Sequence, residues 1–280
     1  MPTINTARSF LFVPGNDERK LRRALSSGAD AVIADLEDAV TPAEKDAARA
    51  LTARVLAEAE GDVLRFVRVN AAGSEWIADD LDTVGALGLH GVVLPKAEAE
   101  AVSEIGVLGL PVLAIVETAA GLRGAFELAR LPAVEALVLG AVDLGLALGL
   151  ERREDGLEVL FARSSLVLDS AAAGLRGPID QVWTTLRDDA GLRSDCELAR
   201  SLGFRGKACI HPEQVPVVND AFSPSSAELA RALDVVRAFE SAAANGRGAV
   251  ALDGEMIDLP VAERARELLA EAKRSVLYGD

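Results

Sequence analysis

The sequence has few of the residues that thiolate metal sites, disulfide frameworks and nucleic-acid surfaces require. Its 280 residues include two cysteines, Cys196 and Cys209, which stand thirteen positions apart and form no CxxC pair. We therefore expect reduced, buried thiols and no metal–thiolate site. Lysine and arginine number 29 against 44 aspartates and glutamates. The resulting formal net charge of −15 argues against nucleic acid or an anionic membrane surface as the main partner.

Long uninterrupted apolar runs are also missing. The first ten residues, MPTINTARSF, contain no apolar signal core, and the longest apolar stretch, LVLGAVDLGLALGL, is broken by Asp143. Neither GLRGAF nor GRGAV has the strand–loop–helix spacing of a Walker or dinucleotide-binding motif. We expect a cytoplasmic protein with no membrane partner, in which any anionic ligand needs a local basic patch.

What the sequence does contain is an alternation of short apolar runs with longer stretches of helical period. This pattern is typical of βα units around a parallel sheet. The strands expected from it, about eight and thus the barrel number, cover residues 9–13, 31–37, 64–70, 91–96, 111–117, 135–143, 178–182 and 207–211. The sequence therefore predicts an α/β fold, a (β/α)8 TIM barrel over residues 1–245. Residues 246–280 exceed what a closed barrel needs and form a predicted C-terminal extension.

Polar and ionisable residues close or follow these apolar runs, where the catalytic groups of a parallel barrel lie. For any one of them alone, a helix cap or an internal ion pair is the simpler explanation. As a set at one rim they favour a functional site, because ionisable groups beside apolar strands cost free energy unless they are paired or bind a ligand. They are Glu37, Asp38, Arg68, Asn70, Lys96, Glu117, Asp143, Asp180 and His211.

A metal at this rim would take oxygen ligands, because the sequence offers two histidines and no usable thiolate pair. Mg²⁺ is the commonest catalytic ion of that kind. Glu117 and Asp143 are the best pair, since they end consecutive predicted strands and leave positions for waters and a bidentate 2-keto acid.

The basic patch that an anionic ligand needs is present in NDERKLRR, residues 16–23. Such a helix is often only a solvated face. In a chain this acidic, four clustered cations without a ligand would be less expected.

Eight segments together resemble the citrate lyase β-subunit group of the HpcH/HpaI aldolase superfamily. In chain order they are RSFLFVPGNDERKL, DAVIADLEDAVTPAEK, VRVN, VLPKAE, AIVETAAG, LGAVDL, GFRGKACIHPEQV and GAVALDGEMIDLP. One motif such as GxxDL is weak evidence, whereas eight in order are highly specific. The group includes citryl-CoA lyase subunits and stand-alone malyl-CoA, methylmalyl-CoA and citramalyl-CoA lyases.

The resemblance implies a Mg²⁺-dependent carbon–carbon lyase with a TIM barrel and a C-terminal lid, commonly a homotrimer. Such an enzyme cleaves or forms a bond between an acyl-CoA thioester and a 2-keto acid such as oxaloacetate, glyoxylate or pyruvate. Two alternatives stay open. One is a subunit of a multi-subunit citrate lyase whose thioester is carried on an acyl carrier protein, and the other is a barrel that binds a keto acid without turnover.

Residue by residue, the resemblance makes Glu117 and Asp143 the Mg²⁺ ligands. Arg68 matches the arginine that clamps the keto-acid carboxylate, a task for which its planar fork is suited. Glu37 and Asp38 are expected to accept hydrogen bonds from Mg²⁺-bound waters, and the alternative that one of them simply pairs with Arg68 is equally good.

The thioester side of the site is also assigned by resemblance, to Arg19 and Arg23 on the CoA phosphates and to Phe12, Ile210 and His211. For Phe12, plain core packing is an alternative, as is a structural role for His211.

Asp258, in GEMIDLP, matches a mobile lid aspartate that acts as general acid/base in a neighbouring subunit's site. The Gly-rich segment ANGRGAV before it could serve as a hinge. The alternative is that Asp258 only caps the final helix, because Leu259 and Pro260 follow it as they would follow an N-cap.

Overall fold

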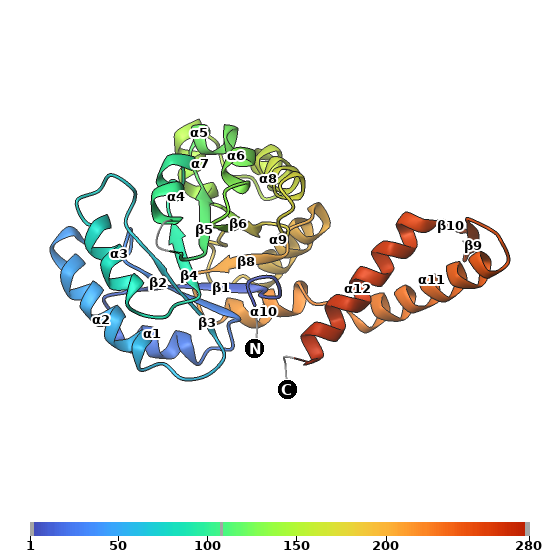
Figure 1. Cartoon of the computed structure of the whole chain (residues 1–280), viewed down its shortest axis with the longest axis horizontal. Coiled ribbons are helices and arrows are strands. Elements are labelled where there is room, and N and C mark those ends of the chain that lie inside the picture. The colour runs from blue at the N-terminus through green and yellow to red at the C-terminus, as the bar shows by residue number, and fades with distance from the viewer. Residues whose placement is uncertain (1–2, 107–108, 278–280) are drawn as a thin grey trace. The chain divides into compact units, whose positions relative to one another are not determined.

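The computed structural model describes residues 3–106 and 109–277. The described residues form two compact units, the barrel unit up to Phe222 and the C-terminal unit from Ser223 onward. In the barrel unit, eight parallel strands follow one another in chain order, and β1 pairs with β8 to close the barrel (Figure 1). The strands are β1 (Ser9–Pro14), β2 (Ala31–Asp35), β3 (Leu64–Arg68), β4 (Gly91–Leu94), β5 (Val112–Val116), β6 (Val134–Leu139), β7 (Ile179–Asp180) and β8 (Gly206–Cys209). The predicted (β/α)8 barrel is confirmed.

Helices connect the strands and surround them (Figure 1). They are α1 (Glu18–Leu25), η1 (Pro42–Glu44), α2 (Lys45–Ala57), α3 (Ile77–Gly85), α4 (Ala99–Gly106), α5 (Ala119–Arg123), α6 (Ala125–Ala129), α7 (Ala141–Leu148), η2 (Leu157–Val159), α8 (Leu160–Ala172), α9 (Asp189–Leu202) and α10 (Gln214–Ala221). Because helices surround the barrel, both faces of each strand are buried, which explains why the strand sequences are apolar runs.

The barrel unit has two apolar layers, which the period of two along each strand explains. Strand residues such as Ile33, Phe66 and Ile115 form an inner cluster that contains no helix residue. The alternating strand residues pack against the helices in a larger outer cluster. On each strand, residues two positions from an inner-cluster residue therefore also point into the barrel.

The C-terminal unit consists of α11 (Ser226–Ala244), the antiparallel pair β9 (Val250–Leu252) and β10 (Glu255–Ile257), and α12 (Leu259–Leu277). It has its own small core, which includes Val235 and Phe239 of α11 and Ala262 of α12. Because α11 packs in this core, the units divide between Phe222 and Ser223. The boundary predicted at residue 245 placed α11 with the barrel and differs from the observed one.

The two cysteines are free and buried, as predicted, and burial raises the pKa of each thiol to about 12. Across residues 3–106 and 109–277, none of the helices combines the length and apolar character that crossing a bilayer requires.

All strands except β1 are shorter than predicted, and for β2 and β6 this changes the setting of rim residues. β2 ends at Asp35, so Glu37 and Asp38 lie in the loop that follows. The Asp35 carboxylate accepts the backbone N–H groups of Glu37 and Ala39 and thereby turns the chain away from the strand. β6 ends at Leu139, and Asp143 lies in the first turn of α7 rather than at a strand end.

Asp180 does not join the rim set. Ile179 before it belongs to the inner cluster, so Asp180 points outward into the helix layer. There it accepts Arg163 Nε at 3.0 Å and pairs with Lys207 of β8, while Asp195 of α9 accepts both Lys207 Nζ at 2.6 Å and Arg163 Nη2 at 2.7 Å. All four side chains are at most 9% exposed. This buried network ties α8 and α9 to β7 and β8, which gives Lys207 a structural role.

We predict that Lys207→Met lowers the free energy of unfolding by about 3–5 kcal/mol, because it leaves two buried carboxylates facing a single guanidinium. Urea denaturation followed by circular dichroism measures the change. The control is Arg153→Met, which breaks a 2.7 Å ion pair with Asp155 that is 57% and 48% exposed. That surface pair should contribute no more than about 1 kcal/mol. Equal effects of the two substitutions would contradict the structural role of the network.

Candidate active site

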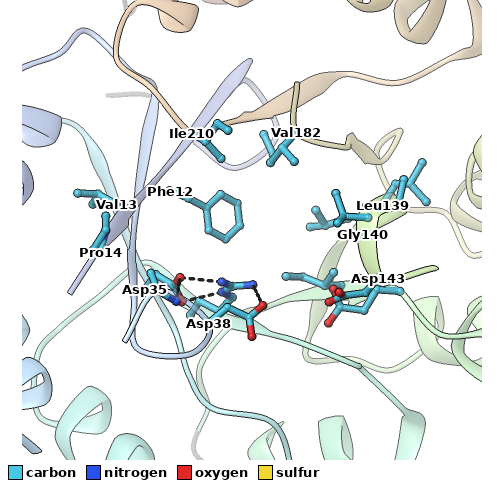
Figure 2. A pocket seen from close by; sticks show the side chains of 18 residues that line it. Phe12, Val13, Pro14, Asp35, Asp38, Leu139, Gly140, Asp143, Val182 and Ile210 are labelled. Atoms are coloured by element: carbon cyan, nitrogen blue, oxygen red, sulfur yellow. Dashed lines mark hydrogen bonds and ion pairs between the residues drawn. The ribbon is translucent and has the colours of Figure 1, made fainter. Parts of the chain in front are cut away.

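A cavity of about 370 Å³ opens at the carboxyl ends of the barrel strands. The labelled carboxylates of Asp35, Asp38 and Asp143 lie along one side of it in Figure 2, and Phe12, Val182 and Ile210 lie toward the other. The cavity therefore has a polar side, where a metal and an acid could bind, and an apolar side.

The strand period explains why three polar residues point into this cavity. Asp35, Arg68 and Glu117 each stand two positions beyond an inner-cluster residue, Ile33, Phe66 and Ile115 respectively. They continue the inward-facing series past the packed interior, and all three line the cavity.

Glu117 and Asp143 provide the carboxylates that could hold a metal. Burial raises the pKa of the Glu117 carboxyl to about 7 and the nearby Asp143 carboxylate adds to the rise, while the Lys96 backbone N–H, donating to Glu117 Oε1 at 2.8 Å, opposes it. Gly140 makes room for this carboxylate, because a Cβ there would lie 2.6 Å from Glu117 Oε2. A buried carboxylate, Glu117, and a partly exposed one, Asp143, thus line the same cavity, which suits a divalent cation.

The small number of protein ligands limits which ion this site can hold. No group of three or more His, Cys, Asp or Glu side chains within the described part of the chain is arranged to hold a metal. An ion held by Glu117 and Asp143 would have to complete its shell with waters and substrate. Mg²⁺ commonly binds in this way, since it keeps several waters and usually takes one or two carboxylates.

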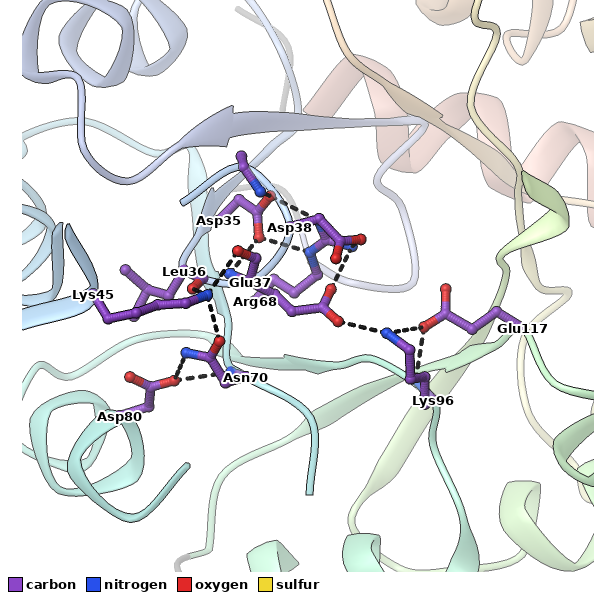
Figure 3. A network of polar contacts seen from close by, with 11 residues as sticks. Asp35, Leu36, Glu37, Asp38, Lys45, Arg68, Asn70, Asp80, Lys96 and Glu117 are labelled. Atoms are coloured by element: carbon purple, nitrogen blue, oxygen red, sulfur yellow. Dashed lines mark hydrogen bonds and ion pairs between the residues drawn. The ribbon is translucent and has the colours of Figure 1, made fainter. Parts of the chain in front are cut away.

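Arg68 is held by three carboxylates rather than standing free. Its Nε and Nη2 donate to the two oxygens of Asp35 at 2.7 and 2.6 Å (Figure 3). Its Nη1 lies 3.0 Å from Glu37 Oε2 and 3.6 Å from Asp38 Oδ2, and its guanidinium lies 5.3 Å from the centre of the Phe12 ring. The expected alternative, pairing of Glu37 or Asp38 with Arg68, is what the structure contains. Their contact with metal-bound waters stays a prediction.

Asp35 was missed as a site residue, although its carboxylate makes the closest contacts with Arg68. Asp35 and Arg68 are cross-strand partners in the register of β2 and β3. The sequence signal was an acid two positions after the inward-facing Ile33. What the sequence could not supply was the register that sets it opposite Arg68.

Lys96 connects the two halves of the polar side. Its Nζ donates to Glu37 Oε1 at 2.6 Å and lies 3.9 Å from Glu117 Oε1. A backbone φ of 48° at Lys96 accompanies the N–H bond to Glu117. The residue therefore holds Glu117 by its backbone and Glu37 by its side chain.

Asn70 lies behind the rim, not in the cavity. It is 2% exposed and donates to Asp80 through its backbone N–H and its Nδ2, while its Oδ1 accepts the ammonium of Lys45 (Figure 3). It therefore supports the loop after β2 from behind.

A second cavity, of about 380 Å³, is lined by cations and shares residues with the first. Arg19, Lys20 and Arg23 of α1 face it, together with His211 and Pro212. The residues common to both cavities are Phe12, Val13, Pro14 and Ile210. The structure thus brings together all the residues predicted for the thioester side. Arg22, from the same basic patch, instead pairs with Glu18 and Glu58 on the surface.

The loop that carries Ile210 and His211 is fixed by Gln214. The Gln214 Oε1 accepts the backbone N–H groups of Ile210 and His211 at 2.9 and 3.3 Å, and its Nε2 donates to Trp183 O at 2.8 Å. His211 Nδ1 itself accepts the backbone N–H of Glu213.

Asp258 lies between β10 and α12 in the C-terminal unit. Its Oδ1 accepts the backbone N–H of Val261 at 3.3 Å, and its carbonyl accepts that of Ala262. The helix-capping role considered as an alternative is therefore present. Its role as an acid/base stays a prediction.

Known proteins of similar sequence span nearly the whole chain. It is 39% identical over 271 residues to a (3S)-malyl-CoA thioesterase of Cereibacter sphaeroides, covering 95% of this chain and 94% of that protein. It is 37% identical over 290 residues to citrate lyase subunit beta of Escherichia coli, covering 96% and 94%.

A solved structure of similar fold is protein CitE of Mycobacterium tuberculosis in complex with magnesium, acetoacetate and coenzyme A. The TM-score is 0.84 at 36% identity, over 96% of this chain and 100% of that one. The citrate lyase beta subunit of the same organism has been solved with oxaloacetate and magnesium, with a TM-score of 0.70 at 36% identity over 79% and 99%. The HpcH/HpaI aldolase/citrate lyase model matches residues 8–212, which include every strand of the barrel. The chain belongs to the HpcH/HpaI aldolase/citrate lyase family.

Proposed function

We propose that this chain is a Mg²⁺-dependent lyase that splits a 3-hydroxyacyl-CoA into an acyl-CoA and a 2-keto acid, or joins the two. One observation carries the proposal. The cavity with the Glu117–Asp143 pair and Arg68 shares Phe12 and Ile210 with a cavity lined by cations. A metal, a small acid and a CoA thioester can therefore meet at one place. The magnesium, acetoacetate and coenzyme A bound by the M. tuberculosis relative agree with these three ligand classes.

The metal would be held by Glu117 and Asp143, and the chemistry it supplies when bound is polarisation of the keto or hydroxyl oxygen of the acid. Arg68 orients the carboxylate of that acid. Asp35 occupies its Nε and one donor of Nη2, so the donors left for the substrate are on Nη1 and on the second N–H of Nη2. Asp38, which is 62% exposed, can yield its 3.6 Å contact with Nη1 to the substrate.

Arg19, Lys20 and Arg23 supply the positive charge for the CoA phosphates, as guanidinium and ammonium groups commonly do. Phe12 and Ile210 then border the path of the apolar arm toward the first cavity. During cleavage a proton leaves the hydroxyl group, the carbon–carbon bond breaks and a proton is returned to the α-carbon of the thioester. We assign the α-carbon proton to Asp258 of a neighbouring subunit in a homo-oligomer, for which a trimer is favoured.

Hydrolysis of the thioester is a second candidate, favoured by the 39% identity to a (3S)-malyl-CoA thioesterase. A panel of (3S)-malyl-CoA, citramalyl-CoA and citryl-CoA, incubated with the protein and Mg²⁺, distinguishes the reactions. A lyase releases a keto acid, trapped as its phenylhydrazone, and an acyl-CoA with no free thiol. A thioesterase releases free CoA thiol, detected with Ellman's reagent, and no keto acid. Binding with neither product would support the non-catalytic barrel.

A carrier-protein substrate is the remaining alternative, favoured by the 37% identity to citrate lyase subunit beta of E. coli. Cleavage of citryl thioesters on an acyl carrier protein, with free acyl-CoA untouched, would establish it. Equal or faster cleavage of the free acyl-CoA would exclude it.

We predict that Glu117→Gln and Asp143→Asn each weaken Mg²⁺ binding more than about 100-fold, because loss of outer-shell partners alone typically costs 10–100-fold. Isothermal titration calorimetry measures the affinity, and circular dichroism checks the fold. Glu127→Gln, at an exposed position of α6, is the control and should bind Mg²⁺ as the wild type does. Undiminished binding in both cavity variants would remove these residues as ligands.

Arg68→Lys should weaken keto-acid binding in saturating Mg²⁺ by roughly 2–5 kcal/mol, since a single ammonium cannot reproduce the fork held by Asp35. Titration with pyruvate and glyoxylate gives the dissociation constants. The exposed Arg153→Lys serves as the matched control. Wild-type constants for Arg68→Lys would make Arg68 structural.

Asp258→Asn should bind substrates normally and turn over at least about 100-fold more slowly, because general acid–base catalysis contributes 10²–10⁴-fold. If Asp258 acts in a neighbouring site, mixed oligomers of Asp258→Asn and Glu117→Gln chains recover part of the activity. Verified mixed oligomers without recovery would exclude action across subunits. Wild-type turnover by Asp258→Asn would exclude the catalytic role.

A further inference from the structure

Lys45, the first residue of α2, is buried beside the polar side of the cavity and makes unusual contacts. Its Nζ donates to Leu36 O at 2.6 Å, to Glu37 O at 2.8 Å and to Asn70 Oδ1 at 2.6 Å (Figure 3). The three N–H donors of the ammonium are thus all used, and each acceptor is a neutral carbonyl oxygen. The Trp76 ring, 5.1 Å from Nζ, lies on another side.

An ion pair does not explain this burial. Among the described residues, no carboxylate oxygen lies within 4.0 Å of Lys45 Nζ, and the side chain is 6% exposed. Burial lowers the pKa of the Lys45 ammonium, with the more distant Asp35 and Asp80 carboxylates acting against it. Burying an ammonium without a counter-ion costs free energy. What Lys45 contributes to the structure is therefore the fixed arrangement of the three oxygen atoms that accept its hydrogen bonds.

Two of those acceptors belong to the loop that carries Glu37 and Asp38. The third, Asn70, is itself fixed, because Asp80 accepts both its backbone N–H and its Nδ2, and Arg49 Nε donates to Asp80 at 2.9 Å. Lys45 therefore joins the carbonyls of residues 36 and 37 to a side chain, Asn70, that is itself held in place.

The side chains of the same loop face Arg68 and Lys96. Glu37 Oε2 lies 3.0 Å from Arg68 Nη1, and Glu37 Oε1 accepts Lys96 Nζ. A shift of the loop would loosen Arg68 at the nitrogen expected to meet the substrate. It would also free Lys96 Nζ, which now lies 3.9 Å from Glu117 Oε1.

We propose that Lys45 is a positioning residue for keto-acid binding. It touches no substrate, and it fixes the backbone of residues 36 and 37 so that Glu37 and Asp38 hold Arg68 in its binding orientation. The inference rests on the proposed function for its ligand, whereas the loop restraint can be measured without any ligand.

The test uses three variants of the full chain. Lys45→Met removes all three donors, and Lys45→Arg restores several, with room in the adjoining cavity of about 470 Å³ that Lys45 lines. Lys207→Met is the matched control, because it disturbs another buried lysine, whose ammonium pairs with Asp180 and Asp195 in the helix layer. The measurements are the dissociation constants of pyruvate in saturating Mg²⁺ and of coenzyme A, and hydrogen exchange of the peptide spanning residues 31–44.

We expect Lys45→Met to weaken pyruvate binding at least about tenfold, equivalent to 1.4 kcal/mol, and to leave the coenzyme A constant within about twofold. Exchange of the 31–44 peptide should accelerate in Lys45→Met alone, and Lys45→Arg should recover most of the pyruvate affinity. Lys207→Met should lose stability yet bind pyruvate normally.

Wild-type pyruvate affinity and wild-type exchange in Lys45→Met would overturn the proposal. Equal losses of pyruvate and coenzyme A affinity in Lys45→Met and Lys207→Met would also overturn it, because general destabilisation would then suffice. If the wild type binds neither ligand in Mg²⁺, the proposed function fails and the role in keto-acid binding fails with it. Faster exchange in Lys45→Met would then still establish the loop restraint by itself.

Discussion

The bidentate pair between Asp35 and Arg68 fixes the polar side of the cavity. The two residues end neighbouring strands in matching register, and Asp35 is 3% exposed. One carboxylate orients the guanidinium plane and also accepts the N–H groups of Glu37 and Ala39 that start the next loop. A buried charge that loses its partner costs several kcal/mol, so the pair constrains strand register and loop direction together.

From this pair, contacts continue around the rim to the metal-binding carboxylates. Glu37 contacts Arg68 with one oxygen and accepts Lys96 with the other, and the Lys96 backbone N–H donates to Glu117. The loops after β2, β4 and β5 are therefore joined by charge-assisted hydrogen bonds. Such bonds hold groups at defined distances, which a site that must orient a small acid requires.

The fold and the inward-facing site residues could be predicted because both depend on period. Apolar runs alternating with helical stretches indicate a βα barrel, and Arg68 and Glu117 follow inner residues at a spacing of two. Asp180 shows that a position at a strand end does not by itself place a residue in the site. It directly follows the inward-facing Ile179 and so points to the helices, where Arg163, Lys207 and Asp195 surround it. These partners lie on α8, α9 and β8, and no local sequence pattern predicts them.

The unit boundary was missed for a related reason. α11 has an apolar face whether it packs on a barrel or on another helix, and only the structure shows Val235 and Phe239 in a core with Ala262. Register, as between Asp35 and Arg68, and the choice of packing partner are both tertiary properties, which sequence period does not encode.

Charge distribution links the two cavities to the ligands proposed for them. The chain carries a net charge of −15, yet the second cavity gathers Arg19, Lys20 and Arg23 where a polyanion would lie. Among the described residues that line the first cavity, four are carboxylates and Arg68 is the one cation. A keto acid entering that cavity alone would be repelled, because low-dielectric walls strengthen like-charge interactions. A divalent ion between Glu117 and Asp143 reverses this balance on the side where the acid must bind. Binding of the metal and of the acid should then be positively coupled, and by linkage each must strengthen the other equally.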